Sequence, residues 1–170
     1  MNNLPPEGTP TVRIERHVVL VAPDVHWNTG NIGRTCLGAN ASLHLIKPLG
    51  FSLDSRQVKR AGLDYWPDVK LFVWDCFKDF SLSYRLLPEQ VFLFTKTGIH
   101  PFWKMPAPKR MFLIFGSESK GLPQQIRDSY RDKTYHIPIT QQIRSLNLST
   151  AVGIALYETL RNTHAFHAYL

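Results

Sequence analysis

The sequence predicts an α/β protein in which helices cover both faces of a mostly parallel sheet. Short runs of consecutive apolar residues alternate along the chain with segments of helical periodicity. Strands that are apolar at every residue are typical of a parallel sheet, because neither of its faces meets water. The 170 residues, 44% of them hydrophobic, suffice for one domain with its own core. Ligands bind such sheets beyond the carboxyl ends of the strands, so the segments that follow the strands are the expected place for a site.

Each element rests on a local pattern. The valine-rich run HVVLVA at 17–22 is typical of a buried strand, and the next segment with helical periodicity is 31–40. Proline stands at the start of the helix expected at 123–131, where its missing N–H is tolerated. Further strands are expected at 43–46, 69–74, 91–95, 111–115 and 134–137, and further helices at 54–62, 76–82 and 149–162.

The last of these helices is apolar on nearly all sides in its first half. A helix with so little polar surface is buried. Burial in the core of the domain and burial in an interface between subunits would both account for this pattern. The sequence alone leaves the two interpretations open.

One domain at 17–170 is expected to follow a flexible leader at 1–16. The start of the leader is polar and proline-rich, and it lacks the basic and apolar regions of a signal peptide. No apolar run reaches the roughly eighteen residues of a membrane-spanning helix, so we expect no membrane contact and a cytoplasmic location.

The chain is basic, with a formal net charge of +7 and a sequence pI of about 9.6. This excess of positive charge favours a polyanionic partner, such as a nucleic acid. The two cysteines, Cys36 and Cys76, are far apart in sequence and are expected to be free thiols. Neither a CxxC pair nor an HExxH motif occurs, so we expect no metal site.

The first candidate segment, WNTGNIGR, follows the first expected strand. Its glycines, Gly30 and Gly33, would permit a positive φ and a close approach of the backbone, while Asn28 and Asn31 could simply cap a helix. Arg34 could hold a phosphate with two parallel hydrogen bonds. The glycines do not form the GxGxxG fingerprint, which argues against a nicotinamide-dependent oxidoreductase.

The second candidate segment, FGSESKGLP at 115–123, leads from a strand into a helix. One interpretation is a tight turn in which Glu118 is solvated. The other is a cofactor loop, in which backbone amides such as that of Gly116 are offered and Glu118 binds a ribose, an amine or a substrate hydroxyl. Both interpretations are open on the sequence alone.

The third candidate segment, at 137–149, joins a strand to the last helix. It places Ser145, Asn147 and Ser149 at alternate positions between two leucines. Helix capping accounts for at least one of these polar residues. The others would be free to bind the edge of a flat apolar ligand that the leucines contact.

In this order, the three segments resemble the signature motifs of the SPOUT RNA methyltransferases. The matches are N-x-G-N-x-x-R at 28–34, FG-x-E-x-x-GLP at 115–123 and IP…SLNLS at 137–149. KPLGF at 47–51 and RAGLDY at 60–65 resemble one subfamily, the minimal bacterial enzymes that methylate the ribose 2′-oxygen of the wobble nucleotide in certain tRNAs. We expect no appended RNA-binding domain, which also fits that subfamily.

The resemblance implies properties that the residue pattern does not show. The C-terminal part of the sheet would be threaded as a trefoil knot, which ordinary topology rules exclude. The protein would be a homodimer through its C-terminal helix, with tRNA as substrate and a wobble cytidine or modified uridine as target. S-adenosylmethionine would be the cofactor and S-adenosylhomocysteine the product. Alternatives are 2′-O-methylation of another RNA, such as ribosomal RNA, and a non-catalytic RNA-binding module.

Site residues follow from the resemblance by position. The polar residues with a functional role would be Asn28, Arg34, Glu118, Ser145 and Asn147. Contacts to the cofactor would come from Leu93, Phe94, Thr95, Gly116, Ile137, Ser145 and Leu146.

In the family, an arginine at the position of Arg34 is a proposed proton acceptor. A guanidinium hardly deprotonates in a protein. We therefore expect Arg34 to bind the phosphate beside the target ribose, and that phosphate, or a water it holds, to take the proton. The residues QQI at 141–143 depart from the family pattern, which leaves the role of that part of the third segment open.

Overall fold

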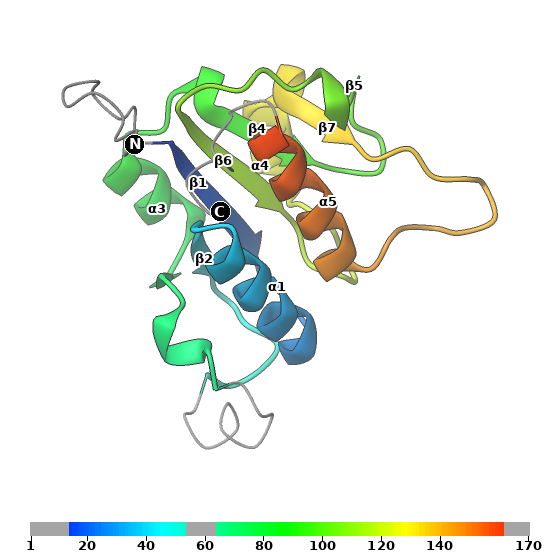
Figure 1. The fold of residues 1–170 in the computed structure, drawn as a ribbon. Helices are drawn as coiled ribbons and strands as arrows, with labels where there is room; N and C mark the ends of the chain where they lie inside the picture. Colours follow the sequence, from blue (N-terminus) through cyan, green and yellow to red (C-terminus); the bar gives the residue numbers. More distant parts are fainter. Residues whose placement is uncertain (1–13, 54–63, 162–170) are drawn as a thin grey trace, which may run out of the picture.

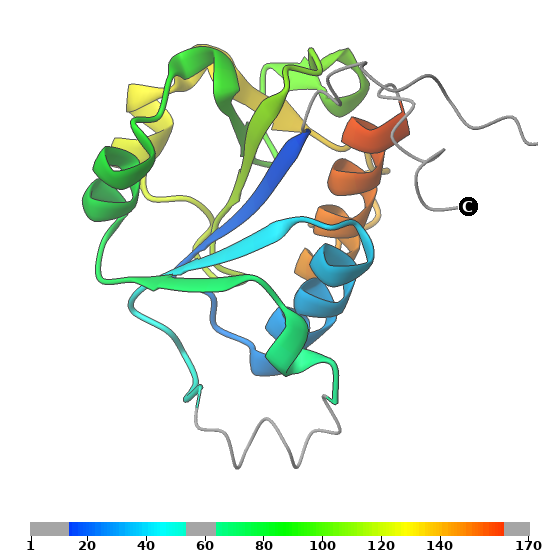
Figure 2. The same cartoon turned by 60° about the vertical axis from the view of Figure 1, so that its left-hand side comes forward.

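The computed structural model describes residues 14–53 and 64–161, and the fold is given for these residues. It is a seven-stranded sheet in which all paired strands are parallel, with helices on both faces (Figures 1 and 2). The predicted α/β class is therefore confirmed. No helix among the described residues is long and apolar enough to cross a membrane.

The sheet has the strand order β3-β2-β1-β6-β4-β7-β5. The strands are β1 (Glu15–Val21), β2 (Ser42–Ile46), β3 (Leu71–Trp74), β4 (Val91–Phe94), β5 (His100–Pro101), β6 (Arg110–Phe115) and β7 (Thr134–His136). The helices are α1 (His26–Gly38), α3 (Phe77–Tyr84), α4 (Gln124–Ser129) and α5 (Leu148–Arg161). Short 3₁₀ turns lie at Trp66–Asp68, Pro88–Gln90, Phe102–Lys104 and Arg131–Lys133.

The register of the central strands brings their carboxyl ends together. Phe115 on β6 is opposite Leu20 on β1 and also opposite Phe94 on β4. Phe94 is in turn opposite Tyr135 on β7. The segments that leave these four strands therefore start at the same level of one sheet edge. The predicted site segments follow three of them.

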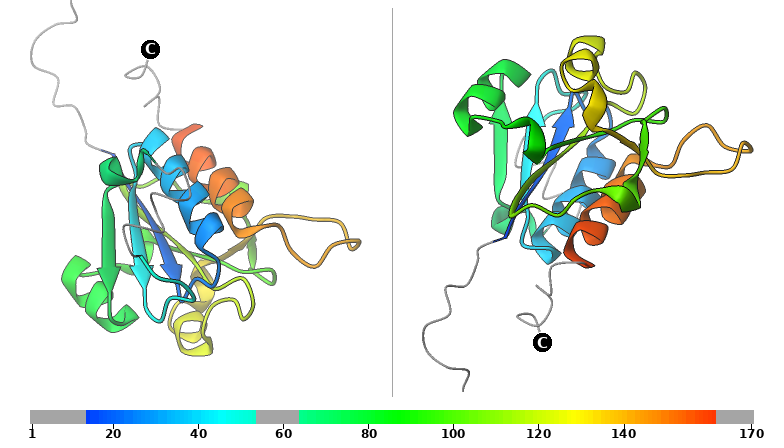
Figure 3. Two further views of the ribbon diagram at one scale, coloured as in Figure 1. Left: turned by 90° about the horizontal axis from the view of Figure 1, so that it is seen from below. Right: turned by 90° about the horizontal axis from the view of Figure 1, so that it is seen from above.

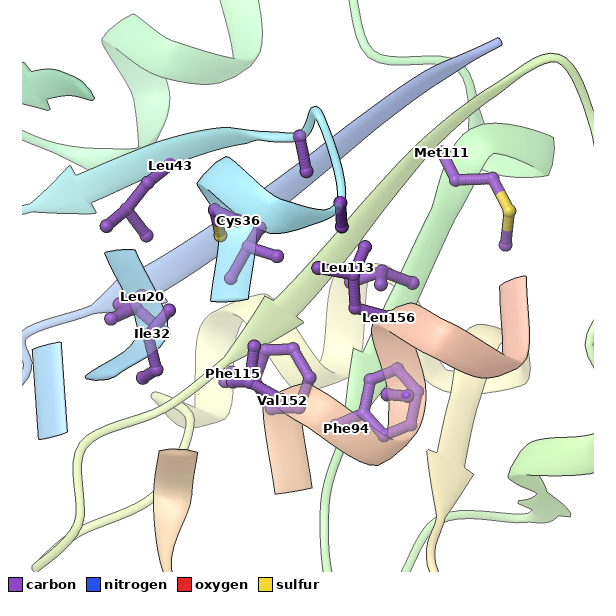
Figure 4. Close-up of a cluster of buried hydrophobic side chains, with 14 of the residues drawn as sticks. Leu20, Ile32, Cys36, Leu43, Phe94, Met111, Leu113, Phe115, Val152 and Leu156 are labelled. Atoms are coloured by element: carbon purple, nitrogen blue, oxygen red, sulfur yellow. The ribbon is translucent and has the colours of Figure 1, made fainter. Parts of the chain in front are cut away.

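Helices α1 and α5 lie side by side on one face of the sheet, and α3 and α4 cover the other (Figures 2 and 3). Side chains alternate between the two faces along each strand, as a β-strand requires. Members of the core beneath α1 and α5 include Leu20, Ile32, Cys36, Phe94, Leu113, Phe115, Val152 and Leu156 (Figure 4). Members of the core beneath α3 and α4 include Val19, Val21, Phe80, Leu93, Ile114 and Ile126.

Most predicted elements begin and end within two residues of the observed ones, but the start of one helix is wrong and one strand was missed. Helix α1 begins at His26, five residues before the predicted start, and the short edge strand β5 was not expected. The helix expected at 54–62 lies outside the described residues. Cys36 is buried and Cys76 exposed, and both are free thiols, as expected.

The first strand begins at Glu15, so its first two residues belong to the sheet although the sequence placed them in the leader. Arg16 is only 3% exposed. Its Nε donates to Thr159 Oγ1 at 3.0 Å, and its Nη1 donates to the Lys109 carbonyl at 3.0 Å. Burial lowers the pKa of Arg16 to about 10. This side chain ties β1 to the last turns of α5, where a positive charge is favourable.

Helix α5 is buried on one face only. Val152, Ala155 and Leu156 are fully buried in the core, whereas Ile154 is 37% exposed and Tyr157 is 43% exposed. Core packing thus explains one side of this helix. The apolar residues on its other side remain at the surface of the chain.

A buried pair of histidines joins β1 and β2 beneath α3. His17 Nδ1 and His44 Nε2 are 2.9 Å apart, and Trp74 Nε1 donates to His44 Nδ1 at 3.2 Å. Because an indole can only donate, His44 carries its proton on Nε2 and donates to His17. Burial lowers the pKa of His17 to about 4 and that of His44 to about 3, so both rings are neutral near pH 7.

The histidine pair should make the free energy of unfolding fall as the pH is lowered from about 6.5 to about 5. Unfolded histidines take up protons in this window, whereas the folded pair stays neutral, so the unfolded state binds more protons. Urea unfolding at several pH values measures this slope. His44→Phe should flatten it, and the same substitution at the exposed His26 should not. A wild-type free energy that is constant over this window would contradict the assignment.

Candidate functional site

A cavity of about 770 Å³ opens at the sheet edge where β1, β4, β6 and β7 end. This volume is within the usual range of small-molecule sites. Its walls come from residues within 25–28, 94–97, 115–127 and 137–151. The segment between β7 and α5 extends away from the body of the protein, and both of its ends reach the cavity (Figures 1 and 3).

All but two of the predicted site residues line this cavity. They are Asn28, Phe94, Thr95, Gly116, Glu118, Ile137, Ser145, Leu146 and Asn147. Leu93 and Arg34 do not line it. Leu93 is fully buried in the core on the α3 and α4 side of the sheet, because neighbouring residues of a strand point to opposite faces.

Three polar side chains from the three candidate segments form one hydrogen-bonded chain. Asn147 Nδ2 donates to Asn28 Oδ1 at 2.9 Å, and Asn28 Nδ2 donates to Glu118 Oε1 at 2.9 Å. Asn147 Oδ1 accepts from the backbone N–H of Ser149 at 2.8 Å and from its hydroxyl at 2.7 Å. The chain therefore runs from the first turn of α5 through α1 to the loop after β6.

The direction of this chain is fixed at both ends. A backbone N–H can only donate, so the oxygen of Asn147 must face α5 and its NH₂ must face Asn28. An ionised carboxylate can only accept, so the NH₂ of Asn28 must face Glu118. Both amide orientations follow from these partners, and Asn147 is the residue that caps α5.

Asp24 adds a second connection between the loop after β1 and the loop after β6. Its backbone N–H donates to Glu118 Oε2 at 2.8 Å, and its Oδ2 accepts from the backbone N–H of Ser119 at 3.0 Å and from the Ser119 hydroxyl at 2.5 Å. The hydroxyl bond holds the pKa of Asp24 below its usual value. Asp24 is not among the predicted site residues, although it is the third residue after the end of β1.

The interpretation of Glu118 as a solvated carboxylate is wrong, because both of its oxygens have partners in the protein. The loop around it is closed by two backbone bonds between Ser117 and Gly121. Gly121 has φ +70°, and a Cβ on Gly116 would collide with the backbone of Gly121. The two glycines of the second motif are therefore needed for the shape of this loop.

The first candidate segment is helix rather than loop, which corrects two expectations. Asn28 is buried and does not cap α1, whose first residues have no side-chain cap. Gly33 has no positive φ. Instead, a Cβ there would collide with the ring of Trp66, so glycine allows α1 to pack closely against that ring. An asparagine before a helix signals a cap equally well, so the sequence could not distinguish the two roles.

Arg34 is exposed on α1 outside the cavity. Its guanidinium carbon lies 4.5 Å from the centre of the Tyr65 ring. The Tyr65 hydroxyl donates to the Gly30 carbonyl at 3.0 Å, which fixes the ring on the helix. A cation–π contact of this kind orients Arg34 while its charge remains available to another partner.

The cavity combines apolar and charged walls. Phe94 and Phe115 stack with their ring centres 4.7 Å apart beneath it. Cationic side chains line it at Lys96, Lys120 and Arg127. No group of three or more potential metal ligands occurs within 14–53 or 64–161. The site can thus hold a partly flat, partly polar ligand beside an anionic one.

Known proteins resemble this chain over the whole site. The family described as "SpoU rRNA Methylase family" matches residues 15–157, from the start of β1 into α5. A protein of Bacillus subtilis (strain 168) named "Putative tRNA (cytidine(34)-2'-O)-methyltransferase" is 42% identical over 85% of this chain and 91% of its own length.

Solved structures agree with this family match. One, from work on the 2-OH methylation of C/U34 on tRNA, has a TM-score of 0.78 and 40% identity over 89% of this chain and 97% of its own. The AdoMet-bound rRNA methyltransferase of Sinorhizobium meliloti has a TM-score of 0.77 and 26% identity, over 88% of this chain and 57% of its own.

Breaking the hydrogen-bonded chain at its centre should destabilise the protein. Asn28→Ala leaves Glu118 Oε1 and Asn147 Nδ2 without the partner that Asn28 supplies, which should lower the free energy of unfolding by about 1–3 kcal/mol. Asn31→Ala, at an exposed position of the same helix, is the control and should change it by less than about 0.5 kcal/mol. Urea unfolding measures both. Equal stability of the two variants would show that the hydrogen-bonded chain does not contribute to the free energy of unfolding.

Proposed function

Because the chain belongs to the SpoU rRNA methylase family, we propose that it is an S-adenosylmethionine-dependent methyltransferase acting on the ribose 2′-oxygen of a tRNA wobble nucleotide, a cytidine or a modified uridine. The observation that carries the proposal is the meeting of the three signature segments at one cavity through Asn147, Asn28 and Glu118. The names of the Bacillus relative and of the C/U34 structure support the tRNA assignment.

The cavity fits the proposed cofactor. Phe94, Ile137 and Leu146 offer apolar contacts suited to a flat base, and the backbone at Gly116 and Thr95 offers polar groups for the remainder. Bound there, S-adenosylmethionine would supply an electrophilic methyl group, and the protein would supply orientation. The AdoMet-bound structure from Sinorhizobium supports this choice of cofactor.

The protein must also place the ribose and accept a proton from its hydroxyl. In this proposal Arg34 binds the phosphate beside the target ribose through two N–H groups, and Tyr65 sets its direction. That phosphate, or a water it holds, takes the proton, because the guanidinium keeps its own charge. Asn28 and Glu118 hold the adjoining wall of the cavity in place.

The proposal includes a homodimer, a trefoil knot in the C-terminal part of the sheet, and a cytoplasmic location, where a tRNA substrate would be found. The dimer is supported by apolar residues on the outer surfaces of the two neighbouring helices. Leu37 on α1 and Ile154 on α5 are each 37% exposed. A second copy that covered these surfaces would account for the apolar side of α5 that the core leaves uncovered.

Nucleoside mass spectrometry of tRNA from a deletion strain tests the function. We expect loss of 2′-O-methylation at the wobble nucleotide and its return when the gene is restored. An unchanged tRNA together with a lost 2′-O-methyl group in ribosomal RNA would overturn the tRNA assignment. Unchanged nucleosides in both RNAs would overturn the proposed activity.

Arg34→Lys should lower kcat/KM for tRNA by roughly 10- to 100-fold, since lysine cannot make the two-pronged contact. The shape of the pH–rate profile should not change, because the proton acceptor in this mechanism is the phosphate, or a water it holds, and not Arg34. Arg85→Lys, at the exposed residue that directly follows α3, is the control for the loss of an arginine. A lysine variant with the full wild-type rate would refute the two-pronged contact.

Sedimentation of the purified protein tests the proposed dimer. Ile154→Glu places a charge on the outer surface of α5 and should produce monomers, whereas the wild type should sediment as a dimer. Leu82→Glu changes a leucine that is 66% exposed on α3, on the other face of the sheet, and should leave the dimer intact. If Ile154→Glu still sediments as a dimer, α5 is not the interface.

A further inference from the structure

Trp27 is an exposed aromatic residue at the edge of the cavity. It is the second residue of α1, lines the cavity and is 64% exposed, more than the other tryptophans. Its ring meets the neighbouring His26 at 4.7 Å in an edge-to-face contact, which leaves most of the indole open. Single exposed apolar residues are common, so exposure alone assigns no role.

The position of Trp27 is nevertheless fixed relative to the site. The next residue, Asn28, is 5% exposed and is hydrogen-bonded to both Glu118 and Asn147. The backbone that carries the indole therefore cannot move without breaking these hydrogen bonds. An exposed ring that projects from a fixed backbone position at the mouth of a cavity is suited to stacking on a flat ligand.

The same cavity carries an excess of positive charge. Lys96, Lys120 and Arg127 line it, and among the described lining residues the one carboxylate, Glu118, is occupied by Asn28 and Asp24. Arg127 Nε is buried without a hydrogen-bond partner, so a donor is still available. S-adenosylmethionine is itself a net cation, so these three cations match a phosphate better than they match the cofactor.

We propose that Trp27 stacks on an unpaired base of the RNA substrate while Lys96, Lys120 and Arg127 contact the neighbouring phosphates. This inference rests on the proposed function and adds a positioning residue to it. An aromatic ring beside a cationic wall is the usual combination for binding single-stranded nucleic acid, because every base has a flat face and every nucleotide a phosphate. The substrate would then present an unpaired loop at the mouth of the cavity.

Binding of a fluorescently labelled anticodon stem-loop RNA, followed by anisotropy, tests the inference apart from catalysis. Trp27→Ala should raise the dissociation constant roughly 5- to 150-fold, the range for the loss of one base–aromatic stack. Trp27→Phe should restore most of the affinity, because a smaller ring still stacks. Trp103→Ala, which removes a tryptophan that is 53% exposed outside the cavity, should leave RNA binding unchanged.

Two further measurements on Trp27→Ala exclude other roles. Calorimetry should show unchanged affinity for S-adenosylmethionine, and sedimentation an unchanged association state. A weaker affinity for the cofactor would place Trp27 against the cofactor instead, and a changed association state would place it in a subunit interface. Either result overturns the inference.

Failure of this inference and failure of the proposed function give different results. If the wild type methylates tRNA and Trp27→Ala binds the RNA as tightly, the stacking role alone is wrong. If the wild type binds the RNA through Trp27 but transfers no methyl group, the inference stands and the proposed activity is wrong. If the wild type binds no RNA, both are wrong.

Discussion

The hydrogen-bonded chain from Asn147 through Asn28 to Glu118 is the constraint on which the site depends. Asn28 is 90 positions from Glu118 and 119 positions from Asn147 along the sequence. Each amide NH₂ donates to an oxygen of the next side chain, and the order of donors and acceptors permits one arrangement only. Unpaired amide or carboxylate groups beside a partly apolar cavity would be costly, so the three segments meet in this geometry or lose stability.

This arrangement links the site to the fold on both sides. Asn147 caps α5 and bonds to Asn28 of α1, so the same contact that shapes the cavity also holds the ends of two packed helices. Arg16 anchors the opposite end of α5 to β1. The outer surfaces of α1 and α5, where we propose the second subunit, are thus rigidly joined to the wall of the cavity. A contact between subunits on these helices would therefore act on elements that carry Asn28 and Asn147.

The sheet could be predicted because runs such as 18–22 and 111–115 are apolar at every residue, a pattern typical of strands buried on both faces of a parallel sheet. The position of the cavity followed from the same pattern, since parallel strands end at one edge. Hydrogen-bond partners that are distant in sequence could not be predicted. Asn28 before a helical pattern looks like a cap, and nothing local distinguishes a carboxylate bound to Asn28 and Asp24 from a solvated one. Arg16, at the end of the expected leader, likewise gives no sign that it will be buried against α5.

The central claim is that Asn28 and Asn147 act as one unit in forming the cofactor site. Calorimetric titration of S-adenosylmethionine into the wild type, Asn28→Ala, Asn147→Ala and the double variant tests it most directly. If the two side chains act together, either single substitution weakens binding, and the double variant binds little worse than the weaker single variant. Independent effects that add in free energy, or single variants that bind as tightly as the wild type, would contradict the account.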